Sequence, residues 1–384
     1  MNKEITKTFA EARKLFPHTK EVVYLNSAAY GPFSTHLIKL INGNMKIRMD
    51  ANQDDSHDAF KLRIDLRKRY AKLIGAKQSD VGVGHSTSLG LNIAAFGLPL
   101  KKGDEVIISD KEFPALVYTF QAAAQERDFK IKMVESTNNC LDISKIEKAI
   151  TKKTKVLAVS FVQFFNGYKN DLQALSDICQ KHNLFFVVDG IQGMGVEPIN
   201  VGKLQIDVFA SGCQKWMLSP QGCGFFYLSE KIRPKLKIPF MTWLGVDWNM
   251  QFGDLFQYDK KYFTTAEKFE FGYYAVLNFY GMAASLDIFE KLKIKNIQKH
   301  NYELIDLLNV YLKSSKSYTV TSSQEKKYRS SIITFTTEDV SKLHQYLTDK
   351  KIIVSQREGS IRVSVHLYNN KSDIQKLIKA LKLF

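Results

Sequence analysis

The sequence predicts an α/β fold in which helices cover both faces of a mainly parallel sheet. Apolar strand-like runs alternate with amphipathic helical runs between residues 104 and 189. The strand-like runs are continuously apolar, as in LFFVV at 184–188, and this is typical of parallel strands buried on both faces. In such a sheet the functional site lies beyond the carboxyl ends of the strands. The chemically distinctive residues of this chain also follow strand ends.

The first third of the chain contains one short strand and several helices. We expect a short amphipathic helix within residues 1–16 and a strand followed by a Gly-Pro turn within 21–33. Helical patterns follow at 35–53 and 61–75. VGVG at 81–84 then predicts a short buried strand, and a helix begins near Leu89.

Strands and helices alternate in the next part of the chain. The predicted strands are 104–110, 130–136 and 155–164, and the helices that follow them are 114–128, 142–153 and 171–183. Residues 230–270 have no regular pattern. Helices are predicted at 275–292 and 294–315, and the tail again alternates strand and helix. We expect the tail to form a smaller α+β domain.

The bulk composition limits the class of protein. The chain has 384 residues, of which 45% are hydrophobic, enough for a large core and two domains. It has no run of about 18 apolar residues, and its first residues lack the apolar core of a signal peptide. Its four cysteines do not have the spacing of a metal site. We therefore expect a reduced, cytoplasmic protein with no metal and no membrane span.

The net charge of +16 makes nucleic acid a partner to consider. The basic residues are mostly lysines spread along helices among acids, and the densest run, 61–72, has the pattern of a solvated helix face. A non-enzymatic nucleic-acid binder is therefore a distant alternative, and we expect no nucleic-acid partner. A positive field also suits an anionic cofactor and substrate.

Residues 184–227 carry the most informative pattern. An acid, Asp189, and a lysine, Lys215, separate three apolar strand-like runs, and each lies just past a strand end. An unpaired ammonium costs several kcal/mol to bury, so a lysine here needs a reason. A desolvated lysine has a lowered pKa and can form a Schiff base, and an acid can pair with the pyridinium nitrogen of pyridoxal phosphate (PLP). For the lysine alone, an exposed position after an edge strand is the alternative.

Thr87 and Ser88 are candidates for binding an anion. They lie between the predicted strand at 81–84 and the helix that follows it. Free N–H groups and hydroxyls at a helix N-terminus bind phosphate, although Ser and Thr also serve there as ordinary caps. Gly82 and Gly84 form a GxG pair, but no complete dinucleotide fingerprint follows.

With these residues assembled, the chain from YLNSAAYGP at 24–32 to SVHLYN at 364–369 resembles the class V aminotransferase family of fold-type I PLP enzymes. The family includes cysteine desulfurases, selenocysteine lyases, isopenicillin N epimerase-like proteins and kynureninase-like enzymes. The strongest match is VVDGIQGMG at 187–195 followed by SGCQKWMLSPQGCGFFY at 211–227.

The resemblance implies a domain organisation. The large PLP-binding domain, with a mainly parallel seven-stranded sheet, would occupy residues 21–270. The smaller C-terminal α+β domain would occupy 271–384, and residues 1–20 would form a segment that packs with it. The resemblance also implies a homodimer, with the aromatic stretch 240–280 as the contact region.

The resemblance also implies roles for individual residues. The catalytic pair would be Lys215, which forms the Schiff base with PLP, and Asp189, which pairs with the pyridine N–H. The other cofactor-binding positions are Thr87, Ser88, Phe113, Gln163 (with Asn166 as its alternative), Gln192 and Gln214. The substrate-binding positions are Arg362 and Asn26. Arg362 would hold the substrate carboxylate by two parallel bonds, and a salt bridge within the small domain is the alternative for this residue.

Two departures from the family pattern limit the function. Where the family often reads RFExGT, this chain has Lys268 to Gly272 followed by Tyr273, so the threonine that reaches a neighbouring subunit's phosphate is missing. Cysteine desulfurases carry a nucleophilic cysteine before their final strands, and residues 313–335 contain none. We expect a PLP enzyme that acts on an amino acid. Transamination, elimination of the cysteine or selenocysteine lyase type, and epimerisation all remain open.

Overall fold

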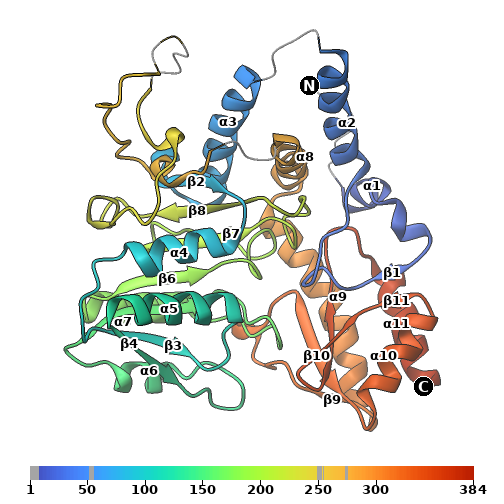
Figure 1. The fold of residues 1–384 in the computed structure, drawn as a ribbon. Helices are drawn as coiled ribbons and strands as arrows, with labels where there is room; N and C mark the ends of the chain where they lie inside the picture. The colour runs from blue at the N-terminus through green and yellow to red at the C-terminus, as the bar shows by residue number, and fades with distance from the viewer. Residues whose placement is uncertain (1–7, 52–55, 249–252, 254, 273–275) are drawn as a thin grey trace.

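The structure is a computed structural model that describes residues 8–51, 56–248, 253, 255–272 and 276–384. A large sheet lies between helices, and smaller sheets lie beside it (Figure 1). The strands are β1 (Val23–Tyr24), β2 (Val81–Gly84), β3 (Glu105–Ser109), β4 (Lys130–Val134), β5 (Thr154–Ser160), β6 (Phe185–Asp189), β7 (Val208–Gly212), β8 (Gly224–Leu228), β9 (Thr319–Val320), β10 (Ile332–Thr336), β11 (Ile352–Ile353), β12 (Ser355–Arg357) and β13 (Ser360–Ser364). The helices are α1 (Phe9–Lys14), α2 (Thr35–Asp50), α3 (Ser56–Ile74), α4 (Thr87–Gly97), α5 (Pro114–Arg127), α6 (Ile143–Ala149), α7 (Leu172–Lys181), α8 (Val276–Leu292), α9 (Ile294–Ser314), α10 (Val340–Asp349) and α11 (Lys371–Leu383).

The large sheet has seven strands in the order β2-β8-β7-β6-β5-β3-β4. Of these seven, β8 runs antiparallel to both of its neighbours, and the strands from β7 to β4 pair in parallel. This order confirms the predicted mainly parallel, seven-stranded sheet. Parallel neighbours require crossovers, and α5, α6 and α7 supply them, as the alternating sequence pattern predicts.

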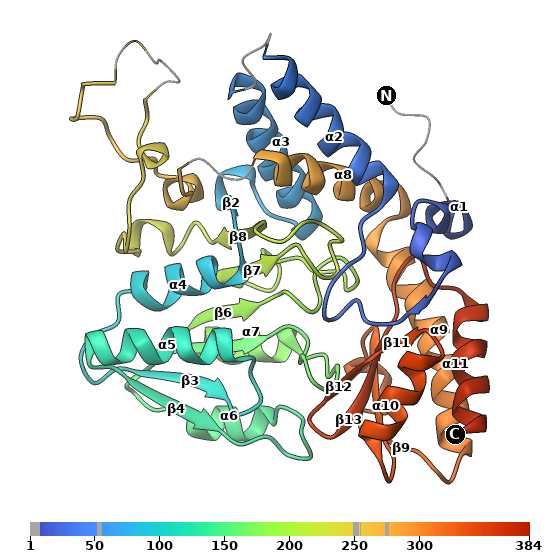
Figure 2. The ribbon, with the colours of Figure 1, turned by 45° about the vertical axis from the view of Figure 1, so that its right-hand side comes forward.

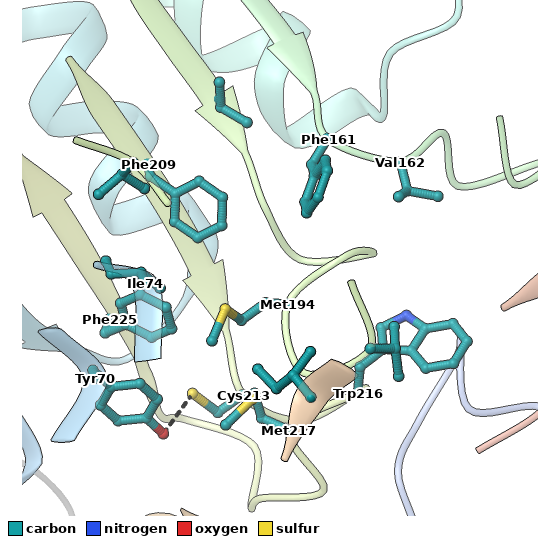
Figure 3. Packing of buried hydrophobic residues seen from close by; sticks show 14 of the residues in the cluster. Tyr70, Ile74, Phe161, Val162, Met194, Phe209, Cys213, Trp216, Met217 and Phe225 are labelled. Atoms are coloured by element: carbon teal, nitrogen blue, oxygen red, sulfur yellow. Dashed lines mark hydrogen bonds between the residues drawn. The ribbon is translucent and has the colours of Figure 1, made fainter. Parts of the chain in front are cut away.

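Successive residues of the central strands are buried on opposite faces of this sheet. Val187 of β6 packs in the cluster that α4 and α5 cover, whereas Val188 packs in the cluster that α3, α7 and α8 cover. Figure 3 shows part of the second cluster, in which the rings of Tyr70 and Phe225 stack at 4.4 Å and Phe209 lies beside them. Burial on both faces explains why the strand sequences are continuously apolar.

The C-terminal part of the chain builds a second sheet, in the order β12-β13-β10-β9, with antiparallel pairing throughout. Its core packs against α9, α10 and α11. The N-terminal segment contacts this part of the chain, because β1 pairs with β11 and Arg13 forms a 2.7 Å ion pair with Asp373 of α11. The residue boundaries of the three expected units stay a prediction.

The two main sheets meet where the parallel strands end. In Figure 2 the arrowheads of β3 and β6 point toward the side on which β12 and β13 lie. Segments that follow the strand ends of the large sheet therefore run between the two sheets. This is the edge at which parallel α/β sheets place their sites.

The structure adds elements that the sequence pattern does not reveal. α3 begins at Ser56, five residues before the predicted start. β12 is a three-residue strand of polar residues, Ser-Gln-Arg, which has no apolar periodicity to mark it. It forms a hairpin with β13 through the two residues Glu358 and Gly359, which both have positive φ.

We predict that two helical glycines respond oppositely to the same substitution. A Cβ at Gly90 of α4 would lie 2.6 Å from the Cβ of Ala210 in β7, whereas a Cβ at Gly43 of α2 would meet nothing within 4 Å. Gly90→Ala should lower the free energy of unfolding by about 1–3 kcal/mol through overpacking. Gly43→Ala should raise it by up to about 1 kcal/mol, since alanine favours the helix. Urea unfolding of both variants measures the difference, and a stabilising Gly90→Ala would contradict the close packing of α4.

Candidate active site

A cavity of about 310 Å³ lies where the strand ends of the large sheet face the second sheet. Eight of the ten predicted site residues line it: Thr87, Ser88, Phe113, Asp189, Gln192, Gln214, Lys215 and Arg362. They come from segments spread over more than 270 positions of the chain, from 87 to 362. The alternation of strands and helices is what brings them to one edge.

Lys215 follows β7 and projects its amine into the cavity. Its backbone carbonyl is closely packed, since a Cβ at Gly31 would lie 2.3 Å from it. Burial, together with the charges of Arg362 and Arg357, lowers the pKa of the Lys215 amine to about 8 against the attraction of Asp189. The Nζ atom lies 5.4 Å from the ring centroid of Phe113. A large fraction of the amine is therefore neutral and nucleophilic near pH 8.

Asp189 is the last residue of β6, the strand next to β7. Its side chain is buried, and Oδ1 accepts a 3.0 Å hydrogen bond from the N–H of Ile191. Burial raises the pKa of this carboxyl to about 6, while the Ile191 bond and the charge of Lys215 oppose the rise. Among the described residues nothing donates a hydrogen bond to Oδ2. The carboxylate can therefore pair with a positively charged group in the cavity.

The N-terminus of α4 forms the part of the cavity suited to an anion. Thr87 Oγ1 accepts a 2.8 Å hydrogen bond from the N–H of Gly212, so its own proton remains to be donated. Ser86 precedes the helix with extended backbone, and its side chain makes no capping bond. Ser88 and Gln214 lie on the same cavity wall. Unpaired N–H groups and hydroxyls at the start of an 11-residue helix suit a phosphate.

Gln192 and Phe113 are held at the cavity by different means. Gln192 Oε1 accepts a 2.8 Å hydrogen bond from Trp216 Nε1, and its Nε2 donates to the carbonyl of Ala28 at 3.2 Å. These two bonds fix the amide. Phe113 is 39% exposed and makes an edge contact with Phe164, with ring centroids 5.1 Å apart. Its ring is thus available to pack against a planar ligand.

Arg362 enters the cavity from β13 of the second sheet. The side chain is buried, Nε donates to Ser355 Oγ at 3.2 Å, and Nη1 donates to the carbonyl of Phe164. Burial and the charge of Arg357 lower the pKa of this guanidinium to about 9, which leaves it charged at neutral pH. No described residue accepts a hydrogen bond from Nη2. An unpaired buried cation at a cavity wall favours an anionic ligand.

The structure does not bring every predicted site residue to the cavity. Gln163 is buried behind the wall, where its Nε2 donates to Glu112 Oε1 at 3.0 Å, and Asn166 bonds the carbonyl of Asn139 instead. Asn26 also lies off the wall, and its Oδ1 is buried without a described partner. Tyr273 lies outside the described residues. Phe164 takes the wall position that we expected of Gln163 or Asn166.

Ser86, Phe164 and Arg357 also line the cavity and are not among the residues predicted from the sequence. Ser86 begins the Ser-Thr-Ser run from which Thr87 and Ser88 were taken, so the run itself was a signal. Arg357 could have been found from the Glu-Gly turn, which predicts a hairpin and so places Arg357 beside the strand of Arg362.

No helix in the described ranges is long and apolar enough to cross a membrane. Within the same ranges, no group of three or more His, Cys, Asp or Glu side chains is arranged to hold a metal ion.

Comparison with known proteins identifies relatives along almost the whole chain. The family model described as Aminotransferase class-V matches residues 35–377. An uncharacterized aminotransferase of Bacillus subtilis, YcbU, is 27% identical over 312 residues, which cover 81% of each protein. A probable cysteine desulfurase of Methanothermobacter thermautotrophicus is 23% identical over 399 residues, with 97% of each covered. The apo cysteine desulfurase of Thermococcus onnurineus NA1 shares the fold, with a TM-score of 0.88, 23% identity and 97% of each chain covered.

We predict that Asp189→Asn stabilises the cofactor-free protein at pH 8. The pKa of Asp189 is raised from 3.8 to about 6 in the folded chain, so ionisation above that pH costs folding free energy. The cost is absent below about pH 4, where folded and unfolded chains both hold the proton. The variant should gain up to about 3 kcal/mol at pH 8, and this gain should shrink as the pH falls.

Urea unfolding between pH 4 and pH 8 measures this gain. Asp110→Asn is the matched control, because Asp110 accepts a 2.9 Å hydrogen bond from the N–H of Ser136 and its pKa is lowered. That variant should lose stability at pH 8. Equal stability of Asp189→Asn and wild type at pH 8 would rule out an ionised, desolvated Asp189.

Proposed function

The chain belongs to the class V aminotransferase family, and on that premise we propose that it is a PLP-dependent enzyme that acts on an amino acid through Lys215. Solved structures of similar fold include a mutant of C-DES, a cystine C-S lyase, with glycine covalently linked to its PLP cofactor. The observation that carries the proposal is the pairing of Lys215 and Asp189. Asp189 ends β6 and Lys215 follows the neighbouring strand β7, both line one cavity, and their pKa values are moved toward each other, to about 6 and about 8.

The cavity residues fit PLP from one end to the other. The α4 N-terminus, Thr87 and Gln214 would hold the phosphate, since they offer N–H, hydroxyl and amide donors. Asp189 Oδ2, which no described donor bonds, would accept the pyridine N–H. Phe113 would pack on the ring, and Gln192 would donate to the ring hydroxyl. These contacts do not include Gln163 and Asn26, because neither residue lines the cavity.

Bound here, PLP supplies an electron sink, since its protonated ring accepts the electron pair left when a bond at the substrate Cα breaks. The residues of the chain have separate tasks around it. Lys215 Nζ would hold the cofactor covalently, and its free amine would move the proton at the substrate Cα. Asp189 keeps a proton on the ring nitrogen. Arg362 binds the substrate carboxylate and so fixes which bond at Cα stands ready to break.

The reaction type is narrowed by the positions of the cysteines. All four cysteines lie in the described part of the chain, and none of them lines the cavity. A thiol that takes sulfur from the substrate at this site is therefore missing from the described structure. This argues against desulfuration through a persulfide on a cavity cysteine. Transamination, the activity in the description of the family model, is the main proposal. Elimination of the cysteine or selenocysteine lyase type and epimerisation, which also need no thiol, are the alternatives.

We propose that the enzyme is a homodimer. Segment 240–272 carries exposed aromatic side chains, including Phe256 at 89% and Tyr258 at 86% exposure, and Met49 at the end of α2 is 75% exposed. Apolar surface of this kind favours a protein interface. Tyr273 lies outside the described residues, so no contact in this interface is assigned to it. The cytoplasmic location stays a prediction.

We predict that borohydride reduction of the PLP-loaded protein fixes the cofactor on Lys215. Only the neutral amine attacks an aldehyde, so capture of PLP by the cofactor-free protein should speed up as the pH rises through about 8 and then level off. Peptide mass spectrometry locates the adduct, and stopped-flow absorbance follows its formation.

Lys268→Met is the matched control for this experiment. Burial also lowers the pKa of Lys268, but its amine donates to the carbonyl of Arg233 and does not line the cavity. This variant should keep the adduct on Lys215, whereas Lys215→Ala should form none. An adduct on any other lysine would overturn the proposed function.

We predict a dimer in solution at micromolar concentration with PLP bound. Replacing Phe256 and Tyr258 together with serine should weaken it, because both rings would lose their burial in the contact. Light scattering of wild type and double variant measures the mass, and Phe384→Ser, at the 42% exposed C-terminus of α11, is the control. A monomeric wild-type holoenzyme would contradict the dimer.

A further inference from the structure

Arg357 is a charged residue of the cavity wall that the proposed reaction does not use. It ends β12, its side chain is exposed, and it lies on the cavity wall together with Arg362. Its Nη1 donates at 2.7 Å to the carbonyl of its own neighbour, Gln356. Within the described part of the chain no carboxylate forms an ion pair with it. The cavity therefore has a second guanidinium whose charge the chain does not neutralise.

The hairpin register places the two guanidiniums on the same face of the sheet. Ser355 pairs with Arg362, and Arg357 pairs with Ser360, in the antiparallel ladder of β12 and β13. Residues two apart on a strand share a face, so Arg357 shares the face of Ser355 and hence that of Arg362. Diagonal neighbours of this kind have Cα atoms about 7–8 Å apart. Side chains as long as arginine can then reach two anionic groups of one small ligand.

The electrostatics of the cavity favour a ligand with two negative groups near this hairpin. Arg357 lowers the pKa values of both Arg362 and Lys215, so its charge acts inside the cavity and not only in solvent. Asp189 is the carboxylate on the cavity wall that opposes these three cations. The proposed phosphate site uses other elements, the N-terminus of α4 and the residues after β7. One substrate carboxylate at Arg362 would still leave the Arg357 charge without a partner.

We propose that Arg357 binds a second, side-chain carboxylate of the substrate, so that the enzyme prefers dicarboxylic α-amino acids. This inference rests on the proposed function, since it assumes that Arg362 holds the α-carboxylate. Arg362 is buried and fixed by Ser355 and Phe164, which suits the group common to all amino acids. Arg357 is more exposed and attached at a hairpin end, which suits the part of the substrate that differs between amino acids.

The test compares acids with their uncharged isosteres on the holoenzyme. L-Aspartate and L-glutamate should exceed L-asparagine and L-glutamine in kcat/KM by about tenfold or more, as expected for one charge-assisted contact. Arg357→Gln should reduce this ratio to near one. Arg362→Gln should lower kcat/KM for acids and amides alike. Lys376→Gln removes the same charge from the exposed face of α11 and should leave the ratio unchanged.

A binding measurement keeps the test independent of turnover. By calorimetry, succinate should bind the wild-type holoenzyme about tenfold more tightly than butyrate, and Arg357→Gln should remove the difference. An equal preference for acid and amide in the wild type, or an equal loss for both in Arg357→Gln, would overturn the inference. The second outcome would mean that Arg357 shares the α-carboxylate with Arg362. Failure of the proposed function would show separately, as the absence of an adduct on Lys215.

Discussion

The desolvation of Lys215 beside Asp189 is the constraint on which the rest of the site depends. Burying either charge alone would cost folding free energy, and the attraction between the two charges reduces that cost for both. They can be neighbours because β6 and β7 pair in parallel and both end at the same edge. Any arrangement that moved β6 away from β7 would remove the attraction that offsets part of the cost of burying each charge. The order of the central strands and the chemistry are therefore linked.

A buried polar network holds the loops around this pair. Glu112, which follows β3, accepts hydrogen bonds from the N–H and hydroxyl of Ser160 at the end of β5 and from Gln163. Burial raises the pKa of Glu112 to about 7 even though these three bonds favour its charged form. The three hydrogen bonds offset part of the cost of burying the carboxyl. They also hold the segment after β3 against the end of β5. Phe113 is the next residue, so this network also sets where its ring stands.

Hydrogen bonds that link β13 of the second sheet to the large sheet and to the N-terminal segment complete the cavity. Arg362 bonds the carbonyl of Phe164, which follows β5 of the large sheet. Ser364 accepts a 3.0 Å hydrogen bond from the N–H of Ala28, and Ala28 in turn accepts from Gln192. The N-terminal segment thus bridges the two sheets at the cavity. Substrate recognition and cofactor binding come from different sheets, which meet at a wall made of short loops.

The sequence by itself determined the fold class and the residues that follow strand ends. Lys215, Asp189 and Thr87 could be predicted because strand-helix alternation is a local pattern and a charged or hydroxyl residue at or just past the end of a buried strand stands out within it. Arg362 lies within β13 instead, and its role was implied only by the family resemblance. Only the tertiary structure decided that Arg357 and Phe164 stand on the cavity wall and that Gln163 does not. Their positions depend on cross-strand register and on competition for distant partners, such as Glu112 for Gln163. The sequence pattern reveals neither the register nor these partners, because both depend on contacts between residues far apart in the chain.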